Sequence, residues 1–173
     1  PGGLIILSAQ AASQVQGGVV GNTGVIDATG ITSSGGVIRL TASNAVYADG
    51  FISADGSINA EGSISAEGSI NADGSINADG SILGAGDGGT ITIIADLDNP
   101  SSHTQVSGSI SSQGGGLGGN GGTIDTSASH VNVADSASVS TLAAQGDAGT
   151  WVIDPDGFSI AATGGDISGS AVT

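Results

Sequence analysis

The chain has 173 residues, which is enough for one domain with a sizeable core, and it carries 16 acidic residues against a single basic one, Arg39. The formal net charge of −15 argues against nucleic acid as a partner, because phosphate neutralisation needs clustered Lys and Arg, and against an anionic membrane surface. There is no cysteine for a disulfide or thiolate metal site, and no apolar stretch approaches the roughly 18 residues that a membrane span needs.

Glycine and small aliphatic residues dominate the composition. The chain has 33 glycines, and only 2% of its residues are aromatic. Disorder is the other Gly-rich option, but disordered chains normally have low hydrophobicity, whereas 38% of these residues are hydrophobic. So much glycine is better explained by tight turns that recur at a fixed period.

A nine-residue phrase, Gly-Gly-x-Ile-x-aliphatic-x-Ala-x, recurs along the chain. Copies start at Gly2, Gly35, Gly88 and Gly121, with a degenerate copy at Ala148. Apolar and polar positions alternate after the glycines, as at Ile38, Leu40 and Ala42, which predicts a strand with one buried face. The paired glycines predict a sharp turn with positive φ.

The spacing of these phrases predicts a solenoid. Gly2 and Gly35 are 33 residues apart, as are Gly88 and Gly121, whereas the interval from Gly35 to Gly88 is longer. The excess of about 20 residues corresponds to one turn of a three-sided β-solenoid, so it indicates one inserted coil. We therefore expect one domain, 1–173, built from blocks 2–34, 35–87, 88–120 and 121–147 and a terminal segment 148–173.

A six-residue repeat over 52–82 supplies the insertion. Each unit places an aliphatic residue, an alanine, an acidic residue and a glycine at fixed positions. The aliphatic positions, predicted to face inward, are Ile52, Ile58, Ile64, Ile70, Ile76 and Ile82. A helix is disfavoured, because six does not fit a 3.6-residue period and each interior Gly would cost about 1 kcal/mol. Three hexapeptide units are predicted to make one triangular coil.

The predicted fold is therefore all-β, a three-sided parallel β-helix with no substantial α-helix. Coils about 4.8 Å apart would stack identical aliphatic residues inside a narrow bore that admits few aromatic rings. At roughly 20 residues per coil the chain would make eight or nine coils.

The acidic positions of the hexapeptide repeat are the main candidate site: Asp55, Glu61, Glu67, Asp73 and Asp79. With three units per coil, Asp55 would lie over Asp73 and Glu61 over Asp79. Such carboxylates are either solvated corners that keep the chain soluble or weak Ca²⁺ ligands, although the Ca²⁺-binding nonapeptide GGxGxDxUx is absent. No other cofactor is expected. His103 and His130 are far apart and lie in no motif, so the chain is not expected to be an enzyme.

The segment AGTWVIDPDGFSIAATGGDISG, Ala148 to Gly169, holds the remaining candidates. Trp151 takes an inward position of the phrase, which predicts a core or end-plug role rather than a sugar-stacking platform. Asp154 and Pro155 belong to IDPDG, where Pro155 fixes φ and Gly157 permits a turn, so a structural loop is favoured over a ligand site.

This segment and the Gly-Gly-x-Ile-x-Leu-x-Ala phrases resemble filamentous-haemagglutinin-type adhesins, which Gram-negative bacteria secrete by the two-partner route. Gly149 to Pro155, Gly-Thr-Trp-aliphatic-Ile-Asp-Pro, is the most specific part of the resemblance. It implies a right-handed parallel β-helix, export to the cell surface, and a role in adhesion or biofilm formation. The family's amino-terminal secretion domain is not recognisable in this sequence.

We therefore expect an extracellular structural or adhesive rod segment. Its partners would be flanking coils of a longer chain or copies of itself stacked end to end, and host or neighbour-cell glycans or proteins. A self-assembling filament subunit is the alternative. A β-helix enzyme acting on polysaccharides is disfavoured, because such lyases need Lys or Arg. A left-handed hexapeptide acyltransferase is disfavoured because the six-residue period is confined to 52–82 and lacks that family's small-residue placement.

Overall fold

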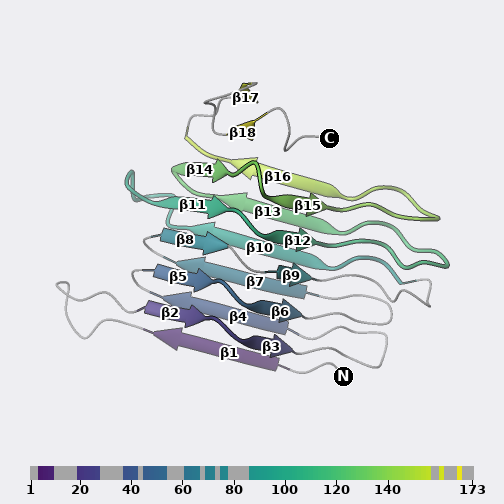
Figure 1. The fold of residues 1–173 in the computed structure, drawn as a ribbon, viewed down its shortest axis with the longest axis horizontal. Coiled ribbons are helices and arrows are strands. Elements are labelled where there is room, and N and C mark those ends of the chain that lie inside the picture. The colour runs from purple at the N-terminus through teal and green to yellow at the C-terminus, as the bar shows by residue number, and fades with distance from the viewer. Residues whose placement is uncertain are drawn as a thin grey trace.

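The computed structural model describes residues 4–9, 19–27, 37–42, 45–53, 61–66, 69–72, 75–77, 86–156, 160–161 and 167–168. Every regular element in these ranges is a β-strand, and the strands pair in parallel (Figure 1). The prediction of an all-β chain is confirmed for these residues, which contain no helix.

The strands form three parallel sheets. The first sheet has the order β1 (Leu4–Ala9), β4 (Val37–Ala42), β7 (Glu61–Ala66), β10 (Thr90–Ala95), β13 (Thr123–Ser127) and β16 (Thr150–Asp154). The second has the order β17 (Ile160–Ala161), β18 (Ile167–Ser168), β14 (His130–Val133), β11 (His103–Val106), β8 (Ser69–Ala72), β5 (Ala45–Ala48) and β2 (Val19–Asn22). The third has the order β15 (Ser138–Ser140), β12 (Ser109–Ser111), β9 (Ser75–Asn77), β6 (Phe51–Ser53) and β3 (Val25–Asp27).

From β1 to β15 the chain visits the sheets in strict rotation, first, second, third and back to the first. We call one such passage a circuit. Each strand of the first sheet pairs with the strand one circuit later, so levels accumulate from the N-terminal to the C-terminal end (Figure 1). The recurring nine-residue phrases supply β1, β4, β10, β13 and β16, which explains why equivalent residues of these phrases come into register.

The circuits are longer than the sequence predicted. Among neighbouring strands of the first sheet, β4 and β7 start closest together in the sequence, at Val37 and Glu61. Even these two starting residues are further apart along the chain than the roughly 20 residues predicted for a coil. The predicted coil length is therefore wrong, and the predicted eight or nine coils compare with six levels among the described strands of the first sheet. In the circuit from β10 to β13 the additional residues lie in connections between the strands, such as 96–102 between β10 and β11.

The hexapeptide repeat takes four units to complete a circuit rather than the predicted three. Ile52 of β6 pairs with Ile76 of β9, four units further along, and Val46 of β5 pairs with Ile70 of β8. Three of the repeat's isoleucines, at 64, 70 and 76, supply the described strands β7, β8 and β9. In the first sheet β7 lies between β4 and β10, so the long interval between the flanking phrases holds two circuits.

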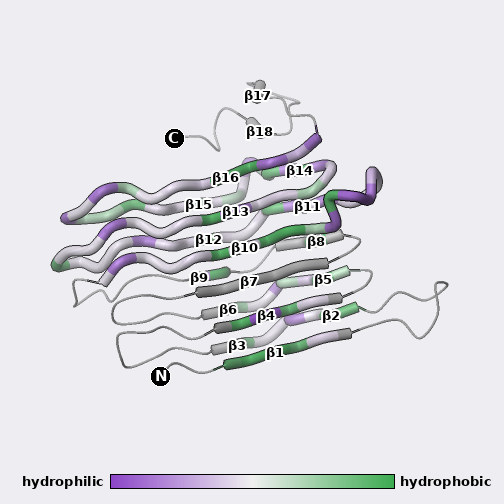
Figure 2. The backbone as a smooth tube through the Cα atoms, turned by 180° about the vertical axis from the view of Figure 1, so that it is seen from behind, coloured by the Kyte–Doolittle hydropathy of each residue, from purple (hydrophilic) through white to green (hydrophobic). Residues whose placement is uncertain are grey.

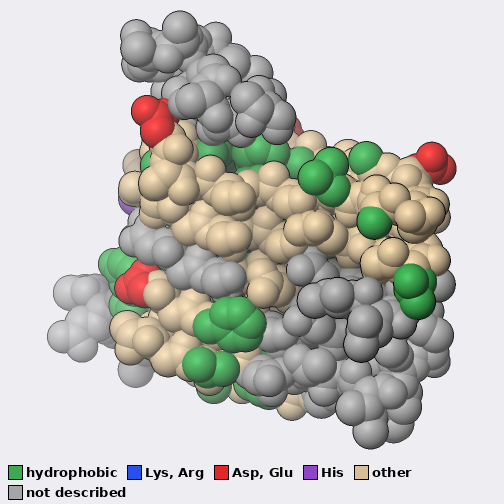
Figure 3. Space-filling model, turned by 45° about the vertical axis from the view of Figure 1, so that its right-hand side comes forward, with side chains coloured by type: hydrophobic (Ala, Val, Ile, Leu, Met, Phe, Trp, Pro, Cys, Tyr) green, Lys and Arg blue, Asp and Glu red, His purple; other side chains and the backbone are tan. Residues whose placement is uncertain are grey.

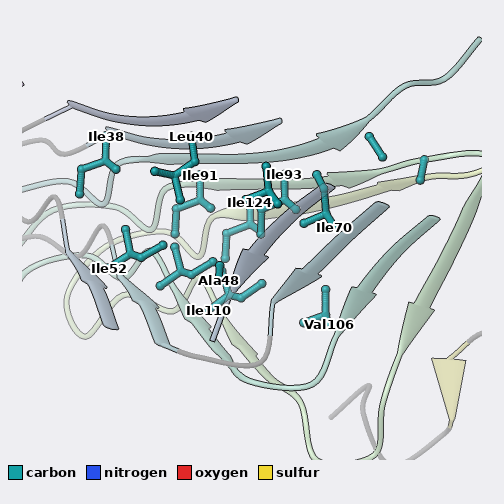
Figure 4. Close-up of a cluster of buried hydrophobic side chains, with 14 of the residues drawn as sticks. Ile38, Leu40, Ala48, Ile52, Ile70, Ile91, Ile93, Val106, Ile110 and Ile124 are labelled. Atoms are coloured by element: carbon teal, nitrogen blue, oxygen red, sulfur yellow. The ribbon is translucent and has the colours of Figure 1, made fainter. Parts of the chain in front are cut away.

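Aliphatic side chains from all three sheets meet in one interior cluster (Figure 4). In the first sheet the most deeply buried ones come from β4, β10 and β13: Ile38, Leu40, Ile91, Ile93 and Ile124 are fully buried. Of the predicted inward isoleucines, Ile52, Ile70 and Ile76 are buried in this cluster. Ile64 pairs with Leu40 and Ile93 through its backbone, whereas Ile58 and Ile82 lie outside the described residues.

Burial in this cluster is the main stabilising term. Each such side chain contributes on the order of 1.5–3 kcal/mol relative to exposure. In Figure 2 the hydrophobic stretches of β10 and β13 run side by side, and hydrophilic residues are concentrated in the loops that connect the sheets. The alternation of apolar and polar residues in the sequence therefore corresponds to alternating burial in the structure. In β10 every second residue is buried, and these buried residues are all aliphatic.

The paired glycines have a different role from the one predicted. Within the described ranges positive φ occurs only at Gly118 and Gly119, not at Gly88, Gly121, Gly122 or Gly149. A Cβ added to Gly149 would instead overlap the backbone carbonyl of Gly122 one circuit earlier. These glycines are required because the backbones of successive circuits approach each other too closely for a side chain.

Candidate functional site

Glu61, the one acidic position of the hexapeptide repeat that lies in the described residues, does not stack as predicted. Glu61 is the first residue of β7 and pairs with Val37 on one side and Thr90 on the other. Its predicted stacking on Asp79 is therefore wrong, because a circuit here takes four hexapeptide units rather than three. Asp55, Glu67, Asp73 and Asp79 lie outside the described residues.

Another acidic residue, Asp87, has a structural role in the loops between the third and first sheets. The Asp87 carboxylate accepts a hydrogen bond of 2.7 Å from the Asn120 backbone N–H, one circuit later. The Asn120 side-chain oxygen in turn accepts one of 3.0 Å from the Asp147 N–H. This Asp87–Asn120–Asp147 ladder satisfies exposed backbone donors and holds three successive loops in register.

The terminal phrase places its aromatic residue in the interior. Trp151 pairs with Ile124 and packs against the aliphatic cluster while remaining half-buried. Its indole N–H donates a hydrogen bond of 2.9 Å to the hydroxyl of Thr126, which is fully buried. Asp154 ends β16, Pro155 follows the strand, and the Asp156 N–H donates to the Ser129 carbonyl. Gly157 lies outside the described residues.

Buried hydroxyl groups donate hydrogen bonds to backbone carbonyls of neighbouring strands and turns. Thr104 donates to the carbonyl of Ser127 at 3.1 Å, and the Ser112 hydroxyl donates to the carbonyl of Gly89 at 2.6 Å. Among the described residues no buried side-chain nitrogen or oxygen is left without a hydrogen-bond partner. These hydroxyls stabilise the folded state, because a buried backbone carbonyl without a hydrogen-bond partner would cost about 1–3 kcal/mol in the free energy of unfolding.

The outward side of the second sheet carries a row of polar side chains. Tyr47 of β5, Gln105 of β11 and Asn132 of β14 occupy equivalent positions along the parallel ladder, in which the backbone of Asn71 in β8 pairs with Tyr47 and with Gln105. Tyr47, Gln105 and Asn132 are exposed. We call this the amide row. Amide groups in one row with a tyrosine can donate and accept hydrogen bonds while the tyrosine offers an apolar ring, and sugars and polar peptide surfaces contact both kinds of group.

Two histidines lie beside the amide row. His103 begins β11 and His130 begins β14, and the two are direct partners in the parallel ladder. In the sequence they look unrelated, because they are far apart along the chain. The similarity of the segments HTQV and HVNV was the signal that could have shown their pairing. The seven-residue connection 96–102 ahead of β11 hides this signal, because it places His103 further from its Gly-Gly phrase than His130 is from its own.

Figure 3 shows one face of the molecule, on which acidic side chains are scattered among polar and backbone atoms. The described residues contain no group of three or more His, Asp or Glu side chains placed to hold a metal ion. The part of the chain that is described also has no helix of the length and apolarity needed to cross a membrane.

Comparison with known proteins gives no further guide to the site. No protein-family model, no curated protein and no solved structure matches this chain.

Proposed function

We propose that this chain is a segment of a right-handed, three-sided parallel β-helix that serves as a structural or adhesive rod in a large secreted surface protein. The parent would be an adhesin of the filamentous-haemagglutinin type, exported to the surface of a Gram-negative bacterium. The chain's own role would be to extend the rod and to present its outer faces to cells or matrix.

The observation that carries this proposal is the in-register rotation of the chain through three parallel sheets. Fifteen consecutive strands, β1 to β15, enter the first, second and third sheets in the same repeating order. Equivalent residues pair from one circuit to the next. Parallel strands joined within one sheet have right-handed connections in nearly all proteins, which supports the handedness. Stability of such a stack depends on neighbouring circuits, so the rod can be lengthened by adding circuits.

The adhesive part of the proposal rests on the amide row. Its outward Tyr47, Gln105 and Asn132 are uncharged and exposed on one face of the second sheet. Adhesion through such a row depends on surface hydrogen bonds and contacts and needs no catalytic group. The buried hydroxyls of Thr104 and Ser112 donate to backbone carbonyls, which is consistent with this proposal.

The shape and the adhesion are tested separately. Cryo-electron microscopy of the purified chain should show a stack with a triangular cross-section and a rung spacing of about 4.8 Å. The chain immobilised on a surface should retain cells or glycans, and Gln105→Ala with Tyr47→Ala should reduce retention. A globular particle without rungs would refute the β-helix, and unchanged retention in the double variant would refute the role of the amide row.

A second candidate function is a filament subunit that stacks end to end. Among the described strands, β1 and β16 are the edges of the first sheet, and β1 exposes Leu4, Ile6 and Leu7, of which Leu7 pairs with the buried Leu40. Exposed apolar residues on an open parallel edge favour pairing with another chain. Electron microscopy of the purified chain at increasing protein concentration decides between the candidates, because only a filament subunit should form particles that grow longer.

A further inference from the structure

His103 and His130 project from adjacent strands on the same side of the second sheet. They are direct partners in the parallel pairing of β11 with β14. Both are exposed, whereas the next residues, Thr104 and Val131, are buried on the opposite side. Adjacent strands are about 4.8 Å apart, so the two histidine side chains start close enough together for both imidazole rings to bind the same ion.

We propose that His103 and His130 together chelate one divalent transition-metal ion of the kind that imidazole prefers, such as Cu²⁺, Ni²⁺ or Zn²⁺. Their separation is similar to the roughly 5–6 Å between Cβ atoms at positions i and i+4 of a helix, the spacing by which the two histidines of HExxH bind zinc. Each ring ligates through one nitrogen, so the other can keep a hydrogen bond to a neighbour.

The surroundings favour a cation without adding a third protein ligand. Asp96 and Asp98 lie in the connection that leads into β11, where the Asp98 N–H donates a hydrogen bond of 2.9 Å to the Asp96 carboxylate. The net charge of −15 raises the local concentration of cations. Because no group of three ligating side chains lies in the described ranges, water completes the coordination, and the ion links two successive circuits.

The test uses the untagged full chain and Cu²⁺ as the probe. These are its only two histidines, and it has no cysteine, so the ligands are easily identified. We expect saturable 1:1 binding by calorimetry and a paramagnetic resonance spectrum with coupling to two imidazole nitrogens. His103→Gln and His130→Gln should each weaken binding at least about tenfold, the lower end of what disturbing a metal site costs.

The matched control is Gln105→Ala, on the same side of β11 two residues further along, which should bind Cu²⁺ like the unmodified chain. Millimolar Ca²⁺ should not compete, because it prefers oxygen ligands. Circular dichroism of each variant checks that the strands are retained. Absence of saturable binding, a spectrum without two imidazole nitrogens, or an affinity unchanged from the unmodified chain in either histidine variant would overturn the proposal.

Discussion

Two adjacent isoleucines in β10 provide a direct test of the inward and outward faces. Ile93 is fully buried and pairs through its backbone with Ile64 of β7 and Thr126 of β13, whereas Ile94 is half-buried on the opposite side of the same strand. Ile93→Ala removes the interior contacts and leaves a cavity, so we expect a loss of about 2–5 kcal/mol in the free energy of unfolding. Ile94→Ala, with the same change in chemistry, should cost below about 1 kcal/mol.

The assay is thermal unfolding followed by circular dichroism, with hydrogen exchange as a second readout. For a chain of this size about 1 kcal/mol shifts Tm by about 2–4 °C, so Ile93→Ala should lower Tm by roughly 4–20 °C. Faster exchange should be concentrated in β7, β10 and β13, because a stack of circuits is stabilised by its neighbours. Equal losses for the two variants, or a larger loss for Ile94→Ala, would refute the assignment of faces.

Three further outcomes follow from the same geometry. Gly149→Ala should lower stability by about 1–3 kcal/mol in urea unfolding, because its Cβ would overlap the Gly122 carbonyl, whereas Gly21→Ala, with open space around it, should be neutral or slightly stabilising. Trp151→Leu should lower Tm by several degrees, since Thr126 loses its indole donor; an unchanged Tm would contradict an interior role. Calcium at millimolar concentration after EDTA should leave Tm unchanged, because the ladder places Val37 and Thr90, and no second carboxylate, directly beside Glu61; a clear rise would support the calcium hypothesis.

The sequence was sufficient to predict the alternating strands and the fate of particular aliphatic residues. The pattern at Ile38 and Leu40 correctly predicted two fully buried side chains, and Ile52, Ile70 and Ile76 are buried as expected. This worked because side-chain direction in a strand follows directly from a period of two.

The register between circuits could not be obtained in the same way. A period of six fits coils of three units and coils of four units equally well, and only the lengths of the connecting loops decide between them. The same uncertainty hid the pairing of His103 with His130, since the connection before β11 differs in length from the one before β14. The role of glycines such as Gly149 was missed because close approach of backbones depends on that register.

The register itself is tested most directly by pairs of introduced cysteines, since the chain has none of its own. Thr123 and Thr150 are exposed direct partners in β13 and β16, at a strand spacing of about 4.8 Å that lies within the Cα range of a disulfide. Val152 is two residues further along β16, beyond that range. We predict rapid intramolecular oxidation of Thr123→Cys with Thr150→Cys and little with Thr123→Cys and Val152→Cys; equal rates, or a faster second pair, would contradict parallel in-register stacking.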